Sequence, residues 1–279
     1  MFSTGVRLML ISTFSFAFIN IIIKELNYLS VFQIVFLRSI FNSLYTFIYL
    51  KKRQISLKGN YQRNLILRGF SGFIAFSLFV YTIQNMPLAT AVTIQYLSPL
   101  FTTIIALFFL NEKFPWIRLV FYLMAFLGVY LIQGFDHSVG YLLVGIGLIS
   151  SFFSGISYNL VRSLRNTNSP ELVVFYFVFI AALFSLPFAI LNWQSIGLKE
   201  FLMILGMSIL TQVAQTSMTK AYQLETLGKL SILNYLGILY AVVLGYLLYD
   251  EKIDFYHTMG TILIFASILS NVLIKNEAA

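Results

Sequence analysis

An arginine inside an apolar segment is the residue with the clearest chemical potential in this sequence. Arg38 is the eighth residue of the apolar run 31–50, about 10 Å from the nearer end of a helix. A charge at that depth costs at least a few kcal/mol unless a cavity or a partner receives it. Because guanidinium binds carboxylates and phosphates in a bidentate fork, Arg38 is a candidate anchor for an anionic ligand. The alternative is a structural arginine that snorkels outward or binds helix carbonyls.

Amide, hydroxyl and aromatic side chains also occur inside the apolar segments. Such polar groups are unfavourable in hydrocarbon without a partner, so they are expected to face the interior of a helix bundle. A bond to a substrate and a bond to a neighbouring helix both satisfy this need. As a cluster they favour a mostly apolar small-molecule site. The candidate binding residues of this kind are Asn20, Tyr81, Gln95, Tyr96, Ser154, Tyr158, Asn159, Gln212, Gln215, Asn234 and Tyr235.

Several reactive groups are missing from the sequence. There is no cysteine, and His137 and His257 fall in predicted loops, so neither a metal nor a cofactor is expected. Because the sequence also lacks a catalytic triad pattern and a phosphate-binding Gly loop, we expect neither an enzyme nor direct use of ATP. Exchangers of lipophilic cations generally need a buried carboxylate, and no apolar segment has Asp or Glu at its middle. The expected ligand is therefore neutral, zwitterionic or anionic.

Membrane-spanning helices must position these residues. Of 279 residues, 59% are apolar and 10% charged, whereas a soluble domain has about 25% charged residues. Long apolar runs divided by polar breaks predict an all-α integral membrane protein. The ten expected spans are 4–24, 31–50, 65–85, 88–110, 116–134, 140–161, 171–191, 200–221, 228–249 and 256–275.

The basic residues predict the orientation of these spans. If the N-terminus is cytoplasmic, all Lys and Arg except Lys24, Arg38, Lys199 and Lys252 lie at or near the inner side, fourteen of eighteen. We therefore expect a multi-pass protein of the cytoplasmic (inner) membrane with both termini in the cytoplasm. The net charge of +8 then reflects cytoplasmic loops enriched in Lys and Arg, so membrane lipid is an expected partner and nucleic acid is not. A monomer or a weak homodimer is expected.

Charges near the ends of the segments have simpler expected roles. Lys220 and Arg68 lie near segment ends and are expected to snorkel. Glu112 and Glu251 each end a segment, where a carboxylate is unfavourable at a helix C-terminus. We expect both acids to have structural partners, such as the N-terminal end of another helix.

The run from Leu88 to Leu110 contains a proline at its middle. It is expected to form one span bent at Pro99, because proline removes a backbone hydrogen bond. Gln95 and Tyr96 stand just before the bend. We expect these two residues and the bend to line one wall of a cavity.

A second copy of the polar pattern begins 139 residues after the first. At that offset Asn20 matches Asn159. Residues 1–138 and 139–279 then form two repeats of five spans each, and the odd number turns the second copy upside down in the membrane. Inverted repeats are typical of transporters that bind their substrate near the midplane between the halves.

The order and spacing of these features resemble the drug/metabolite transporter superfamily, EamA branch. The motifs that carry the resemblance are Asn20 to Lys24, Phe36-Leu37-Arg38, and Ala91 through Pro99 to Leu110-Asn111-Glu112-Lys113. The resemblance implies ten helices around a central cavity, transport of small metabolites, often outward, and a place for Lys24 at the cavity mouth. In the second half Phe177 stands at the position of Arg38, and Ile238 at that of Pro99, so an asymmetric site is expected.

These features predict a secondary active or facilitative transporter that works by alternating access. The expected solute is a small metabolite, either an amino acid or a related carboxylate-bearing or nucleoside-like compound. A membrane-embedded enzyme is the first alternative, although the acids are scattered and the histidines fall in loops. A non-transporting membrane scaffold is the second alternative, and it predicts no cavity between the halves.

Overall fold

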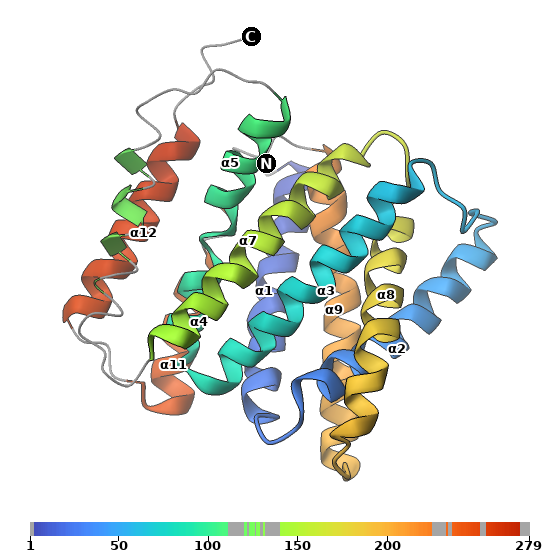
Figure 1. Cartoon of the computed structure of the whole chain (residues 1–279), viewed down its shortest axis with the longest axis horizontal. Helices are drawn as coiled ribbons and strands as arrows, with labels where there is room; N and C mark the ends of the chain where they lie inside the picture. Colours follow the sequence, from blue (N-terminus) through green and yellow to red (C-terminus); the bar gives the residue numbers. More distant parts are fainter. Residues whose placement is uncertain are drawn as a thin grey trace.

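The described part of the chain is helical. The computed structural model describes residues 3–110, 120–121, 123–125, 127–128, 131, 140–224, 233, 236–251 and 255–273, and these contain no strand (Figure 1). The helices are α1 (Thr4–Glu25), α2 (Val31–Lys52), α3 (Gln62–Asn85), α4 (Leu88–Gln95), α5 (Ser98–Leu110), α7 (Tyr141–Ser163), α8 (Pro170–Leu191), α9 (Leu198–Leu224), α11 (Leu236–Tyr249) and α12 (Phe255–Leu273).

Six of these helices are long and apolar enough to cross a membrane. They are α1, α2, α3, α7, α8 and α9, with 22 to 27 residues each. Each matches a predicted span to within three residues at either end. α11 and α12 cover the described parts of two more predicted spans, whereas the predicted span 116–134 falls largely outside the described residues. The count of ten therefore stays a prediction.

The predicted continuous span 88–110 is wrong in one respect, because it consists of two helices. α4 ends where the amide of Tyr96 donates to the carbonyl of Val92, at 3.0 Å. α5 begins at Ser98. In its first turn the amides of Leu100 and Phe101 donate to the carbonyl of Leu97. Pro99 lies in this first turn, where its missing amide hydrogen leaves no intrahelical bond unmade. The proline thus starts a new helix instead of bending an existing one.

The helices pack in pairs that join the two predicted halves. α1 lies against α9, α3 against α7, and α2 against α8 (Figure 1). The offset of 139 residues relates α1 to α7 and α3 to α9, so the first two pairs exchange with each other under it. Large aliphatic side chains, including Ile23, Ile83 and Leu88, are fully buried in the core of the bundle.

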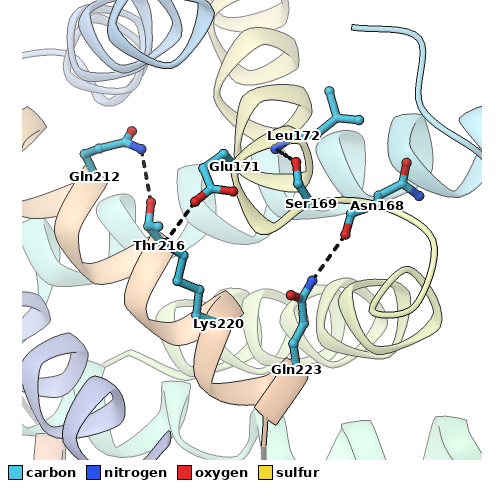
Figure 2. A network of polar contacts seen from close by, with 8 residues as sticks. All are labelled: Asn168, Ser169, Glu171, Leu172, Gln212, Thr216, Lys220 and Gln223. Carbon is cyan, nitrogen blue, oxygen red and sulfur yellow. Dashed lines mark hydrogen bonds and ion pairs between the residues drawn. The ribbon is translucent and has the colours of Figure 1, made fainter. Parts of the chain in front are cut away.

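One end of the bundle is held by a group of contacts that we call the Asn168 network. The side-chain oxygen of Asn168 accepts from the amide of Asn60 at 2.9 Å, and its nitrogen donates to the Asn60 carbonyl at 2.9 Å. Gln223 donates to the Asn168 carbonyl at 3.4 Å, and Lys220 lies 2.9 Å from Glu171 (Figure 2). The network ties the loop between α2 and α3 to the start of α8 and the end of α9. Lys220, which is expected to snorkel, keeps a partly exposed side chain and pairs with a carboxylate.

The opposite end is held by contacts around Glu251, which we call the Glu251 corner. The Glu251 carboxylate accepts from the backbone amides of Leu88 and Ala89, the first residues of α4. Lys24 donates to the carbonyl of Met86 at 2.6 Å. The expected structural role of Glu251 at a helix N-terminus is confirmed, since orphan amides and the helix dipole both favour an anion there. Glu112 lies outside the described residues.

Candidate functional site

A cavity of about 110 Å³ lies inside the bundle, between helices of both predicted halves. Residues of α1, α3, α4, α5, α7, α8 and α9 form its walls. They are Phe16, Ile19, Asn20, Arg68, Gly72, Ala75, Phe76, Phe79, Gln95, Tyr96, Ser98, Pro99, Ser154, Ser157, Tyr158, Phe177, Gln215 and Met218. The lining is mostly apolar with a few polar groups, which is the usual composition of a small-molecule site.

Six of the residues predicted to bind a ligand line this cavity. They are Asn20, Gln95, Tyr96, Ser154, Tyr158 and Gln215. The break between α4 and α5 brings its own residues to the wall, as expected from the proline. Their presence in one cavity places them where a solute could meet them, and their role in binding stays a prediction.

Serine hydroxyls of α7 hold the amide of Gln95. Its nitrogen donates to Ser154 at 2.8 Å, and Ser150 donates to its oxygen at 2.8 Å. The Gln95 side chain is therefore fixed in the wall by helix-to-helix bonds. Gln215 differs, because its buried side-chain oxygen has no hydrogen-bond partner. Gln215 is thus the more available amide for a solute.

Tyr96 reaches from the break toward α11, where it needs a glycine. A Cβ atom added to Gly237 would lie 1.9 Å from the Tyr96 hydroxyl oxygen, so any larger residue would displace the ring. Gly237 therefore sets how deeply Tyr96 can sit against α11. Tyr235, which matches Tyr96 in the predicted repeat, and its neighbour Asn234 lie outside the described residues.

Two of the remaining predicted residues that the structure describes, Asn159 and Gln212, are not among those that line the cavity. Asn159 donates to the carbonyls of Thr102 and Gly155, so it joins α7 to α5. Gln212 accepts from Thr46 at 3.0 Å and joins α9 to α2. Both side chains thus form hydrogen bonds between helices, which is one of the two roles expected for such polar residues.

Two more predicted residues lie away from the cavity. Tyr81 is 38% exposed on the outside of α3. Lys24 is committed to the Glu251 corner through its bond to the Met86 carbonyl. Lys24, expected at the cavity mouth, is not among the residues that line the cavity.

Arg38 is buried behind the cavity wall. It is 1% exposed, and its guanidinium carbon lies 3.7 Å from the ring centre of Phe76 and 5.5 Å from that of Phe177. The side chain donates to the Ser39 hydroxyl at 3.2 Å, while its Nε atom has no partner. The snorkelling alternative is thus wrong for Arg38. The residue faces two aromatic rings of the cavity wall without lining the cavity itself.

Arg68 is the functional candidate that the sequence interpretation missed. It was expected to snorkel, yet it is 2% exposed and lines the cavity. The error came from the boundary: α3 begins at Gln62, not at residue 65, so Arg68 lies about 9 Å inside the helix. Gly72, one helical turn after Arg68, is a sequence feature that could have indicated a buried Arg68 side chain. A Cβ atom there would lie 2.3 Å from a guanidinium nitrogen of Arg68, so the glycine makes room for it.

Arg68 is the charged residue among those that line the cavity. No carboxylate of the described residues lies within 4 Å of the Arg68 guanidinium, and its Nε atom has no hydrogen-bond partner. The guanidinium carbon lies 4.6 Å from the ring centre of Phe177, which offers only a cation–π contact. A buried guanidinium in this state attracts an oxyanion, because a carboxylate or phosphate would satisfy its unused donors.

The fold and the comparison with known sequences agree on the class of protein. The model of the EamA-like transporter family matches residues 3–134 and 139–273, so the chain belongs to this family. The resemblance to drug/metabolite transporters is confirmed. The protein is therefore a transporter with several membrane-spanning helices.

Named relatives resemble the chain along nearly its whole length. The chain is 26% identical over 276 residues to the pseudopaline exporter CntI of Pseudomonas aeruginosa, covering 96% of this chain and 95% of that protein. It is 23% identical over 288 residues to the S-adenosylmethionine uptake transporter of Rickettsia conorii, covering 99% and 94%. One relative is named for export and the other for uptake.

A solved structure has the same fold. The crystal structure of another protein superimposes on 98% of both chains with a TM-score of 0.71, at 14% sequence identity. At this identity the likeness concerns the path of the backbone.

Proposed function

We propose that this transporter carries a small metabolite with a carboxylate or similar anionic group, by alternating access through the central cavity. The solute is an amino acid or a related carboxylate-bearing or nucleoside-like compound. The observation that carries the proposal is Arg68, a buried cation that lines the cavity and has no carboxylate of the described residues within 4 Å. Leaving such a charge unpaired is costly, so the site is built for a ligand that supplies the missing anion.

The other polar groups of the cavity fit the rest of such a solute. The free oxygen of Gln215 can accept from an ammonium or hydroxyl group. The ring of Tyr96 and the side chain of Asn20 offer a stacking surface and an amide on other walls. A carboxylate on Arg68 and a donor on Gln215 together would orient an amino acid or a similar bifunctional molecule.

The packing of the helices supports alternating access between two inverted halves. The pairs α1–α9 and α7–α3 exchange under the offset of 139 residues, and the family model matches twice, on either side of residues 135–138. Inverted halves of this kind can rock about a site at the membrane midplane. Placement in the cytoplasmic membrane with both termini inside remains part of the proposal, supported by the distribution of Lys and Arg.

A non-transporting scaffold is the weaker candidate. It predicts no cavity between the halves, whereas a cavity lined by Arg68, Gln95 and Gln215 is present. A membrane-embedded enzyme would need acids or histidines at reaction distance, and the family assignment favours transport.

Reconstitution tests the proposal. A thermal-shift screen of amino acids, other carboxylates and nucleosides on the purified chain first finds a ligand, because binding to the folded state raises Tm. Uptake of that ligand is then measured in proteoliposomes. Arg68→Gln is expected to lower transport by about tenfold to 100-fold, since it removes a charged hydrogen bond worth about 1.5–3 kcal/mol.

A matched control separates binding from general damage. Arg63→Gln changes an exposed arginine of the same helix and is expected to transport normally. If Arg68→Gln folds, inserts and transports the ligand as the unchanged protein does, Arg68 is not the anchor.

A further inference from the structure

Two buried arginines pack against the same lining residue. The Phe177 ring centre lies 4.6 Å from the guanidinium carbon of Arg68 and 5.5 Å from that of Arg38. The two cations are therefore no more than about 10 Å apart, the sum of these distances. They come from different helices, Arg68 from α3 and Arg38 from α2.

The described carboxylates do not neutralise this pair. All five lie at helix ends: Glu25, Glu171, Glu200, Asp250 and Glu251. Four of them have partners there, with Glu171 on Lys220, Glu25 on Tyr249, Glu200 on the Gly197 amide, and Glu251 on α4. Both guanidinium groups also retain a buried Nε atom without a hydrogen-bond partner. Among the described residues, the cavity thus has one cation in its lining, Arg68, a second cation behind the lining, Arg38, and no carboxylate beside either.

Arg38 acts on the cavity from behind an aromatic layer. Its guanidinium packs on Phe76 and Phe177, and both rings line the cavity. Charges interact over such distances in the interior of a protein, where screening is weaker than in water. A monoanion bound at Arg68 would compensate one of the two cations. A second negative charge on the solute would be attracted by Arg38 without touching it.

We infer that the cavity selects solutes with two anionic groups, such as dicarboxylates or phosphomonoesters, and that Arg38 is the residue that favours the second group. This inference rests on the proposed function, in which Arg68 binds the first anionic group. Arg38 is accordingly a specificity-determining residue. A merely structural Arg38 would stabilise the contact of α2 with α3 and α8 and leave the charge preference of the site unchanged.

Matched pairs of probes that differ by one anionic group test the inference. The pairs are glutamate and glutamine, aspartate and asparagine, and phosphoserine and serine, and their Kd values are measured on the full chain in detergent. The unchanged protein is expected to bind the more negative member about tenfold more tightly, as an attraction across about 10 Å at an effective dielectric constant near 20 predicts. Arg38→Gln is expected to bring this ratio close to one. Arg38→Lys keeps the charge and is expected to keep most of the ratio.

The outcomes separate the inference from the proposed function. Binding that needs Arg68 but shows equal Kd values within every pair overturns the selection of dianions, and this test uses only the unchanged protein and Arg68→Gln. A folded Arg38→Gln variant that keeps the full ratio overturns the role of Arg38. If no probe binds in a manner that depends on Arg68, the proposed function itself fails and the inference fails with it. Arg63→Gln serves again as the control.

Discussion

The two ends of the bundle share one kind of contact, but among the described residues only the Glu251 corner adds a carboxylate that accepts from the first backbone amides of another helix. Beside the Glu251 corner, the buried side chain of Gln33 donates to the carbonyl of Gln194 at 2.7 Å and accepts from its amide at 3.0 Å. In the Asn168 network, Asn168 makes the same two bonds with the backbone of Asn60. In each case an amide of one predicted half holds a loop of the other half.

The difference between the ends lies in the charged contacts. Glu251 binds two backbone amides at the start of α4, a charge-assisted contact roughly twice as strong as a neutral one. The Asn168 network adds an ion pair between Lys220 and Glu171, whose side chains are 41% and 12% exposed. An ion pair with one side chain open to water contributes little. We therefore expect the Asn168 end to open with less cost than the Glu251 end.

The largest effect is expected at the Glu251 corner. Glu251→Ala leaves the amides of Leu88 and Ala89 without their acceptor, which should lower the free energy of unfolding by about 2–3 kcal/mol. The change in Tm of the purified protein measures it. Asp250→Asn is the control, because it removes a neighbouring charge while keeping a residue that tolerates the positive φ of 50°. Equal losses in the two variants would show that the capping bonds are not what holds this end.

An intermediate effect is expected in the Asn168 network. Asn168→Ala removes both hydrogen bonds to Asn60. Because Asn60 is exposed, water can replace part of them, so the free energy of unfolding should fall by about 1 kcal/mol, measured as a change in Tm.

A thiol in the cavity can report how easily this end opens. The chain has no cysteine, so Ser157→Cys places a single thiol in the cavity lining. Labelling of this thiol from the Asn168 side of the membrane should become faster in the Asn168→Ala background.

The same thiol supplies the control for this prediction. Asn64→Ala removes one exposed bond, from Asn64 to the Ser163 hydroxyl at 3.3 Å, at the same end of the bundle. It should leave the labelling rate nearly unchanged. Faster labelling from the Glu251 side in the Asn168→Ala variant would reverse our ranking of the two ends.

Much of the fold could be predicted because the apolar runs themselves define the helices. The six membrane-length helices begin and end within three residues of the predicted spans. The break before Pro99 could not be placed in the same way. Proline is compatible with a kink and with the first turn of a new helix, and packing of Tyr96 against Gly237 accompanies the second arrangement here.

The candidate site was harder to predict, because depth and direction of a side chain depend on helix boundaries and neighbours. A shift of three residues at the start of α3 changed Arg68 from an edge residue to a cavity residue. Asn20 and Asn159 match each other in the predicted repeat, yet Asn20 lines the cavity and Asn159 donates to the Thr102 carbonyl. Sequence showed that both amides need partners, and only packing decided which partner each one has.

The smallest effect is expected from the partly exposed ion pair of the Asn168 network. Lys220→Met should lower the free energy of unfolding by less than about 1 kcal/mol, and added salt should reduce that loss further. Glu171→Gln should cost more than Lys220→Met, because Glu171 also lies in the first turn of α8, where the helix dipole favours an anion. Tm values of both variants at low and high salt measure the difference. A Lys220→Met loss as large as that of Asn168→Ala would mean that charge, and not the amide bonds to Asn60, holds this end closed.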